Sequence, residues 1–313
     1  PRDRAGQQAV FAARLPRFEA SPVIFEFLDL TRKARTLPPP ANLGQGLLIR
    51  AAVEIDPVRA EFHGNLGLIL KAVGRFDEAE AAFHEALRIN PDFVDALVNL
   101  GGLELELGKI EPSLSRLRHA VELDPAHGNA VMNLGNALRA DGSIRAAEAA
   151  HVKATGLMPL SERAHLNLAT TLMDLERLED AERALKRALT LCPGLIEAQN
   201  NFAFLLINRS DFDGAGRWFS RAVAIQPDYA APRSGLAEVA YYRLDVETCL
   251  QHSAAAVELA PRDPQIRVRH SMRLLAAGRL GEGWDEREWR RLTPGRVQRL
   301  GLPPLWQGED PAG

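Results

Sequence analysis

Seven prolines recur along this chain at a constant interval of 34 residues. They are Pro57, Pro91, Pro125, Pro159, Pro193, Pro227 and Pro261. Two apolar runs with helical spacing precede most of these prolines, as in residues 62–73 and 78–89, and the second run ends just before the proline. Proline inside a helix removes a hydrogen bond and clashes with the preceding turn, so it ends the second helix. The spacing therefore predicts a series of helix–turn–helix hairpins.

Small side chains occupy the same places in every repeat when position 1 is the third residue after each proline, as at Ala60. Position 27 is alanine in all six full repeats, and positions 8 and 20 hold only glycine, alanine, serine or cysteine. Small residues at fixed places allow two helices to pack closely. Gly74, Gly108 and Gly142 lie where the first helix ends, and glycine supplies the left-handed conformation that a tight turn needs.

The 34-residue period, the small residues at positions 8, 20 and 27 and the proline at position 32 resemble the tetratricopeptide repeat. The resemblance extends over roughly residues 45–280. It implies an all-α fold: a right-handed α-solenoid superhelix of 34-residue helix–turn–helix repeats, in which each repeat contacts only its neighbours. In this family the first helix of each repeat faces the concave side, so the first helices are expected to line a binding groove.

The repeat register divides the chain into segments. Residues 1–43 are expected to form an irregular or helical cap, since the end of a solenoid must be covered, and a docking or targeting segment is the alternative. Residues 44–59 read as a half repeat, residues 264–291 as a degenerate repeat or cap, and residues 292–313 as a linker or the start of a further domain. The six full repeats are 60–93, 94–127, 128–161, 162–195, 196–229 and 230–263.

Asparagine recurs at position 6, on the first helix, in five consecutive repeats. These ladder asparagines are Asn65, Asn99, Asn133, Asn167 and Asn201. An amide offers a donor and an acceptor, so such a row is able to pair with the backbone of an extended peptide without reading its side chains. The row resembles the ladder in the tetratricopeptide arm of protein O-GlcNAc transferases, which implies a role in gripping a substrate backbone. The alternative is a local hydrogen-bonding or solvated residue, since asparagine is common at this position in the repeat.

Other polar residues are expected beside the ladder. They are Asn129, Asn136, Thr170, Asn200 and Asn208. These residues predict a polar, hydrated groove rather than an apolar one. Arg139 and Arg163 are possible anion contacts. A carboxylate clamp of the co-chaperone kind is disfavoured, because position 5 carries no lysine to pair with a buried carboxylate.

Nothing in the sequence predicts catalysis, a metal or a cofactor. The histidines are scattered over different repeat positions, and none has the i, i+4 spacing around a glutamate that a zinc helix needs. His151 replaces an apolar packing residue, while Cys192 and Cys249 are expected to be structural. There is no glycine-rich phosphate loop and no nucleophile elbow. We therefore expect that this chain is not itself an enzyme.

Tryptophans gather at the C-terminal end. Trp284, Trp289 and Trp306 lie in the last thirty residues and are expected to dock against a surface, as a cap or as part of a further domain. The pattern G-W-x-x-x-E-W-R followed by P-x-W-x-G-E resembles the junction in bacterial proteins where a tetratricopeptide array leads into a glycosyltransferase-like domain. That resemblance implies a catalytic domain beyond Gly313.

The composition limits the class of partner. Net charge −3 argues against nucleic-acid binding, and no apolar run approaches the ~18 residues of a membrane span. Two distant cysteines favour a reducing compartment, so a cytoplasmic location is expected. The leading hypothesis is a scaffold that binds a partner protein or extended peptide in the groove. The alternatives are the substrate-recognition arm of a glycosyltransferase, with the array contacting its own catalytic domain, and a self-associating scaffold.

Overall fold

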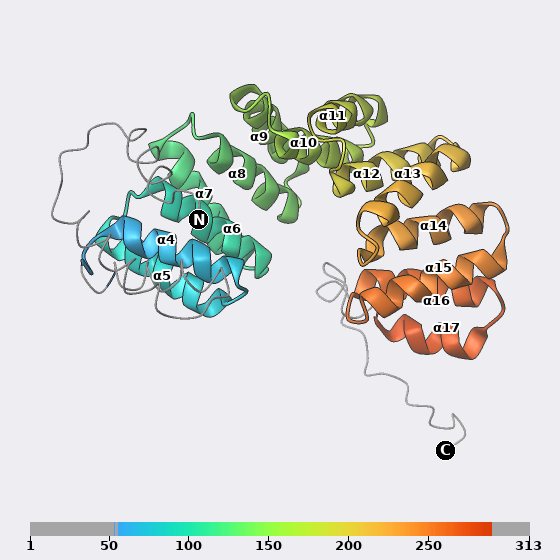
Figure 1. Ribbon diagram of the computed structural model, residues 1–313. Coiled ribbons are helices and arrows are strands. Elements are labelled where there is room, and N and C mark those ends of the chain that lie inside the picture. Colours follow the sequence, from blue (N-terminus) through green and yellow to red (C-terminus); the bar gives the residue numbers. More distant parts are fainter. Residues whose placement is uncertain (1–52, 54–55, 290–313) are drawn as a thin grey trace, which may run out of the picture. The chain divides into compact units, whose positions relative to one another are not determined.

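The computed structural model describes residue 53 and residues 56–289, and within these residues it contains fourteen α-helices and no strand (Figure 1). The first helices of the hairpins are 13 residues long and begin every 34 residues. They are α4 (Ala60–Ala72), α6 (Val94–Glu106), α8 (Gly128–Ala140), α10 (Glu162–Asp174), α12 (Ile196–Asn208), α14 (Ala230–Tyr242) and α16 (Pro264–Ala276).

The second helices follow the same interval and are 14 residues long, except for the last. They are α5 (Phe76–Ile89), α7 (Ile110–Leu123), α9 (Ile144–Leu157), α11 (Leu178–Leu191), α13 (Phe212–Ile225), α15 (Val246–Leu259) and α17 (Leu280–Arg287). The helices therefore confirm the predicted fold of 34-residue helical hairpins. The predictions for residues 1–43 and 292–313, and nearly all of 44–55, fall outside the described residues.

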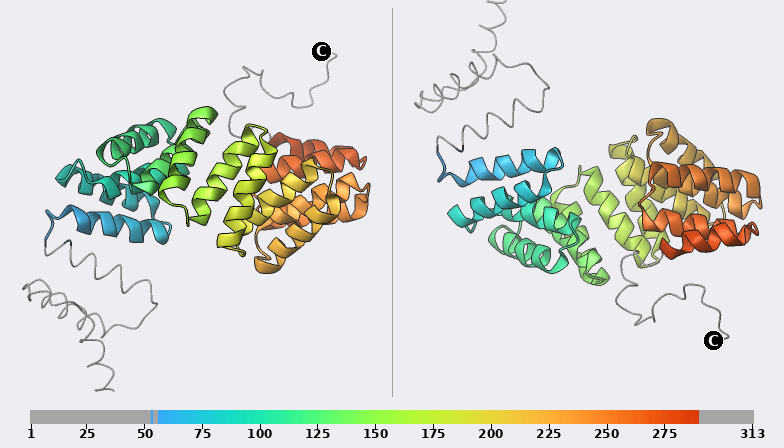
Figure 2. Two further views of the ribbon diagram at one scale, coloured as in Figure 1. Left: turned by 90° about the horizontal axis from the view of Figure 1, so that it is seen from above. Right: turned by 90° about the horizontal axis from the view of Figure 1, so that it is seen from below.

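The helices belong to two compact units, the first ending at Ala150 and the second beginning at His151, both within α9. Inside each unit a second helix packs against its own first helix and against the first helix of the next repeat, as α5 does with α4 and α6. Neighbouring first helices also touch, as α4 touches α6 and α12 touches α14. Figures 1 and 2 show this consecutive packing, most plainly for α14 to α17.

The small residues at positions 20 and 27 lie at the helix–helix contacts. Every alanine at position 27 is fully buried, and position 20 is at most 4% exposed. A side chain larger than glycine has no room at Gly67, because a Cβ atom there would lie 2.6 Å from the ring of Phe83. The hydroxyl of Ser113 fits among the small residues by donating to the carbonyl of Gly101 at 2.7 Å. Close packing of this kind explains why the sequence tolerates only small residues at these places.

The turn between the two helices of a hairpin passes through a left-handed residue in every repeat. The prediction for Gly74, Gly108 and Gly142 is confirmed, since each has φ between +75° and +86°. At Gly74 the turn forms a Schellman motif, with Gly74 N donating to Lys71 O and Arg75 N donating to Leu70 O. The equivalent residues in the next three repeats are not glycine: Glu176, Ser210 and Leu244 all have φ +59°.

Among the described residues, no helix combines the length and the apolar character that a bilayer crossing requires.

Candidate functional site

The ladder asparagines of the first unit lie on three successive first helices, of which the middle one, α6, contacts both α4 and α8. Asn65 is on α4, Asn99 on α6 and Asn133 on α8; Asn65 is exposed and the other two are half-buried. The amide nitrogen of Asn133 reaches back over α6, since it lies 3.4 Å from the place where a Cβ of Gly102 would stand. The row therefore runs across neighbouring helices with its amide groups near the surface.

The second unit repeats this arrangement with Asn167 on α10 and Asn201 on α12, both half-buried. Asn201 Nδ2 donates to Thr170 Oγ1 at 3.1 Å, and that hydroxyl donates to Leu166 O at 3.0 Å. Thr170 and Gly102 occupy the same position 9 of their repeats. A position-6 asparagine thus lies over position 9 of the preceding first helix in both units.

The ladder ends at α14, where position 6 is Gly235 rather than asparagine. The ring of Phe219 fills the space that a side chain would need, because a Cβ on Gly235 would overlap it. The same position on α16 is Arg269, which lies over the ring of Phe204 at 5.5 Å. The amide character of the row is therefore confined to α4 through α12.

The other polar residues expected beside the ladder differ in their surroundings. Asn129 and Asn208 lie near the ends of α8 and α12 and are exposed, and Asn136 is half-buried on α8. Asn200 is only 8% exposed, and its Oδ1 is buried without a hydrogen-bond partner in the described part of the chain. Asn200 is consequently the most enclosed acceptor beside the ladder.

The two arginines expected to contact an anion belong to different compact units. Arg139 is the penultimate residue of α8 and Arg163 is the second residue of α10. Both are exposed. Their joint role stays a prediction.

Two of the three tryptophans expected to dock are described. Trp289 is half-buried beneath the guanidinium of Arg267, which lies 4.5 Å from the ring centre and also pairs with Glu286. Trp284 is 57% exposed on α17. Trp306 lies outside the described residues.

His151 and Cys249 are buried, in agreement with the structural roles expected for them. His151 Nδ1 lies 2.9 Å from Thr171 Oγ1 and has no exposed surface. Burial raises the pKa of the Cys249 thiol, which disfavours the reactive thiolate. Burial also lowers the pKa of His270, whose Nδ1 lies 2.8 Å from Ser253 Oγ.

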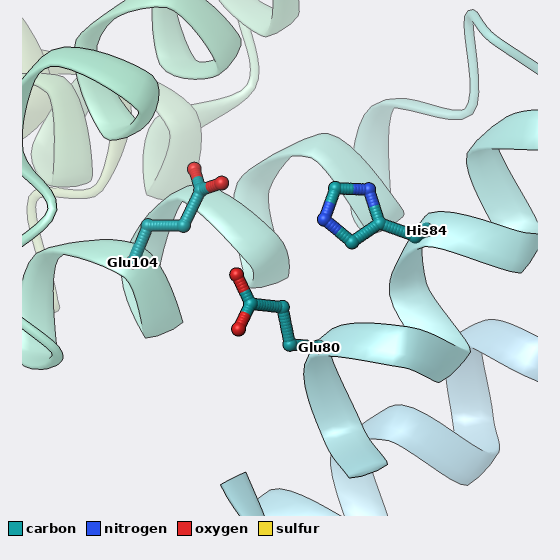
Figure 3. A group of neighbouring side chains, drawn as sticks. All are labelled: Glu80, His84 and Glu104. Atoms are coloured by element: carbon teal, nitrogen blue, oxygen red, sulfur yellow. The ribbon is translucent and has the colours of Figure 1, made fainter. Parts of the chain in front are cut away.

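One cluster of ligand-type side chains escaped the sequence analysis. Glu80 and His84 on α5 and Glu104 on α6 point toward one another, with one ligand atom of each within 4.8 Å of the others (Figure 3). Both carboxylates already have cationic partners: Lys109 Nζ donates to Glu80, and Arg116 Nε donates to Glu104 at 2.8 Å. The cluster therefore reads as an inter-helix ion-pair network.

A signal for this network was present in the sequence. Glu104 is 2% exposed and stands at position 11, where the other first helices of the array carry leucine or alanine. Its partner Arg116 stands at position 23, which is alanine in three other repeats. A charge at a core position requires a paired counter-charge, so the two departures belong together.

Comparison with known proteins agrees with the hairpin fold. A family model described as "Tetratricopeptide repeat" matches residues 60–93, and a second model of that description matches residues 127–196. Among curated proteins, none matches this sequence.

Three solved structures illustrate the likeness in fold. A chain of the APC/C hetero-tetramer Cut9–Hcn1 aligns with TM-score 0.66 and 16% identity over 80% of this chain, which spans 50% of that chain. A tetratricopeptide repeat protein from Parabacteroides merdae gives TM-score 0.63 and 18% identity, covering 80% of this chain and 97% of the other. PilF of Pseudomonas aeruginosa gives TM-score 0.56 and 18% identity, covering 68% and 95%. At these identities the likeness concerns the fold alone.

Proposed function

Because the chain is a tetratricopeptide-repeat protein, we propose that its first helices bind an extended peptide through the ladder asparagines. Tetratricopeptide repeats generally mediate protein interactions and are typically non-catalytic, so a protein-interaction scaffold is the coarse function. The finer proposal depends on one observation, the recurrence of an amide at position 6 on neighbouring first helices within each unit.

The chemistry of the ladder suits a peptide backbone. An amide side chain both donates and accepts hydrogen bonds, as a peptide group does. In the described residues no side chain accepts from or donates to Asn65, Asn99 or Asn167, so their amides are open to a ligand.

Replacing Asn65, Asn99 and Asn133 together by alanine tests the proposal within the first unit. Peptides selected on the native chain from a random display library should lose at least about tenfold in affinity, since each lost amide removes hydrogen bonds of about 1 kcal/mol. Far-UV circular dichroism should be unchanged, because these side chains are not in the packed interior. Calorimetry with the selected peptides measures the affinity.

A matched control carries three alanines on second helices, at the exposed residues Arg118, Arg187 and Gln251. This variant should bind the selected peptides as the native chain does. Equal affinity of the ladder variant and the control for every selected peptide would refute the ladder as the binding element.

The second candidate, a substrate-recognition arm of a glycosyltransferase, is favoured by the exposed Trp284 and Leu280 on α17. Exposed apolar side chains on the last described helix suit attachment of a further domain. Reading the gene beyond Gly313 tests it: a continuation of ~200 residues with an alternating strand–helix pattern supports the arm, and a stop codon removes it. Light scattering over a concentration series tests the third hypothesis, self-association.

A further inference from the structure

A pocket of about 330 Å³ opens in the second unit between the α14–α15 turn and the end of α16. Its wall includes Tyr242, Val246 and Ala276, and Arg273 lies in it as well. The ladder asparagines are not among its lining residues, so it is distinct from the site proposed above.

The pocket lies at a contact between a second helix and the next first helix. Two aromatic residues fill this contact one repeat earlier, whereas two smaller residues stand here. There Phe212 stacks on Tyr242, with ring centres 5.1 Å apart and planes 15° from parallel. The equivalent residues 34 positions later are Val246 and Ala276. The space that the two rings occupy in one interface is thus left open in the next, and the pocket has room for an aromatic side chain.

The inner wall carries a buried charge that the repeat pattern does not call for. Arg273 is 7% exposed, and its counterparts at position 10 in the other first helices include Leu103, Leu205 and Val239. Its Nη2 pairs with Glu238, and its Nη1 donates to Arg269 O at 3.0 Å. Its Nε is buried and has no oxygen or nitrogen partner among the described residues; the Cys249 thiol, which also lines the pocket, is the weak polar group beside the guanidinium. A donor left in this state favours a ligand that brings an acceptor oxygen.

The rim of the pocket is apolar and faces solvent. Tyr241 and Tyr242 are 46% and 48% exposed, Val246 is 53% exposed, and Leu244 is 86% exposed. Leu244 also holds the left-handed conformation that glycine takes at Gly74 and Gly278. A cluster of exposed apolar side chains around a pocket marks an interaction site.

We propose that this pocket binds an acidic segment of a partner polypeptide, in which an aromatic side chain enters beside Val246 and Ala276 and a neighbouring carboxylate accepts from Arg273. The ring takes the place that Tyr242 takes against Phe212. The carboxylate supplies the oxygen acceptor that Arg273 Nε lacks, and a charge-assisted bond of this kind is stronger than a neutral one.

Three capped tripeptides separate the two parts of the proposal. The probe is acetyl-aspartyl-phenylalanyl-aspartamide; the first comparison peptide replaces both aspartyl residues by asparaginyl, and the second replaces phenylalanyl by alanyl. Ligand-detected nuclear magnetic resonance titration of the full 313-residue chain measures each affinity. The acidic aromatic probe should bind at least about tenfold more tightly than either comparison peptide.

Two variants assign the binding to the pocket. Ala276→Tyr rebuilds the stack seen between Phe212 and Tyr242 and should abolish binding of the probe with no loss of helicity. Ala72→Tyr makes the same change at the same position of α4 in the first unit and should leave binding intact. Arg273→Met should bring the aspartyl and asparaginyl peptides to equal affinity.

Several results overturn the proposal. No binding of the acidic probe would do so, as would equal affinity for the aspartyl and asparaginyl peptides on the native chain. Undiminished binding by Ala276→Tyr would place the ligand elsewhere. The ladder residues are untouched in every variant, so these failures leave the proposed function standing.

Discussion

Replacing Leu244 by glycine should raise the free energy of unfolding of the second unit. Leu244 has φ +59°, in the left-handed region that Gly74, Gly108, Gly142 and Gly278 occupy in other repeats. An L-residue in this conformation costs about 1–2 kcal/mol because its Cβ crowds the following carbonyl. The side chain is 86% exposed, so its removal forfeits little buried apolar surface.

The gain is partly offset in the unfolded chain. Glycine has more backbone freedom to lose on folding, which costs about 0.5–1 kcal/mol relative to other residues. The difference leaves a net stabilisation of about 0–1.5 kcal/mol, with a midpoint of about 0.75 kcal/mol. The Schellman bonds from Leu244 N to Tyr241 O and from Asp245 N to Ala240 O should persist, since they involve only backbone atoms.

Urea denaturation followed by tryptophan fluorescence suits this measurement. All four tryptophans lie between residues 218 and 306, so the signal reports on the second half of the chain. Leu160→Gly is the matched control: Leu160 is 73% exposed but is not among the described residues with positive φ. It should lose about 0.5–1 kcal/mol. If both variants change stability by the same amount and sign, the conformational argument is wrong.

Two further predictions concern buried ionisable groups. Arg116→Ala should destabilise the first unit by about 3–5 kcal/mol because it leaves the buried Glu104 without its counter-charge, whereas the double variant Glu104→Leu with Arg116→Ala should recover most of that loss. Thermal unfolding by circular dichroism measures both, and a double variant no more stable than the single one would contradict the pairing. The folded chain should also lose stability as pH falls below about 6.5, because burial lowers the pKa of His270 and so the unfolded chain binds the proton first. Urea midpoints at pH 8 and pH 5 should differ less for His270→Gln than for the native chain, and an equal difference in both would exclude His270 as the source.

Much of the fold was predictable because it is encoded locally and repeatedly. The alanines of position 27 and the prolines of position 32 each recur in step, and among the described residues the backbone contacts between helices join only the same or neighbouring hairpins, so the register alone places the helices. The left-handed conformation of the turn glycines was equally predictable. Their counterparts Glu176, Ser210 and Leu244 carry no local signal for a left-handed conformation, and only the 34-residue register points to them.

The candidate sites were less predictable, because they depend on departures from the repeat. The ladder asparagines were visible as a regular feature, and their binding role stays a prediction. The pocket beside Arg273 was not visible, since it results from the absence of bulk at Val246 and Ala276 and from knowing which positions meet across an interface. The prediction for Trp306 falls outside the described residues. The repeat pattern indicates how the hairpins stack on one another, but it does not indicate which partner they bind.

The contacts between successive repeats of the second unit have a consequence for the order of the hairpins along the chain. Columns of buried alanine make any hairpin compatible with any other, so they carry no information about sequence order. The stack of Phe212 on Tyr242 and the pairing of Glu238 with Arg273 each join successive repeats, and neither pair of residues recurs at the same positions in the other described repeats. Such pairs specify which hairpins are neighbours. A different order of hairpins would keep the alanine contacts but separate these partners, leaving a ring uncovered and a guanidinium without its carboxylate. The regular positions are compatible with any order of hairpins, whereas the irregular pairs are compatible only with the order found in this chain.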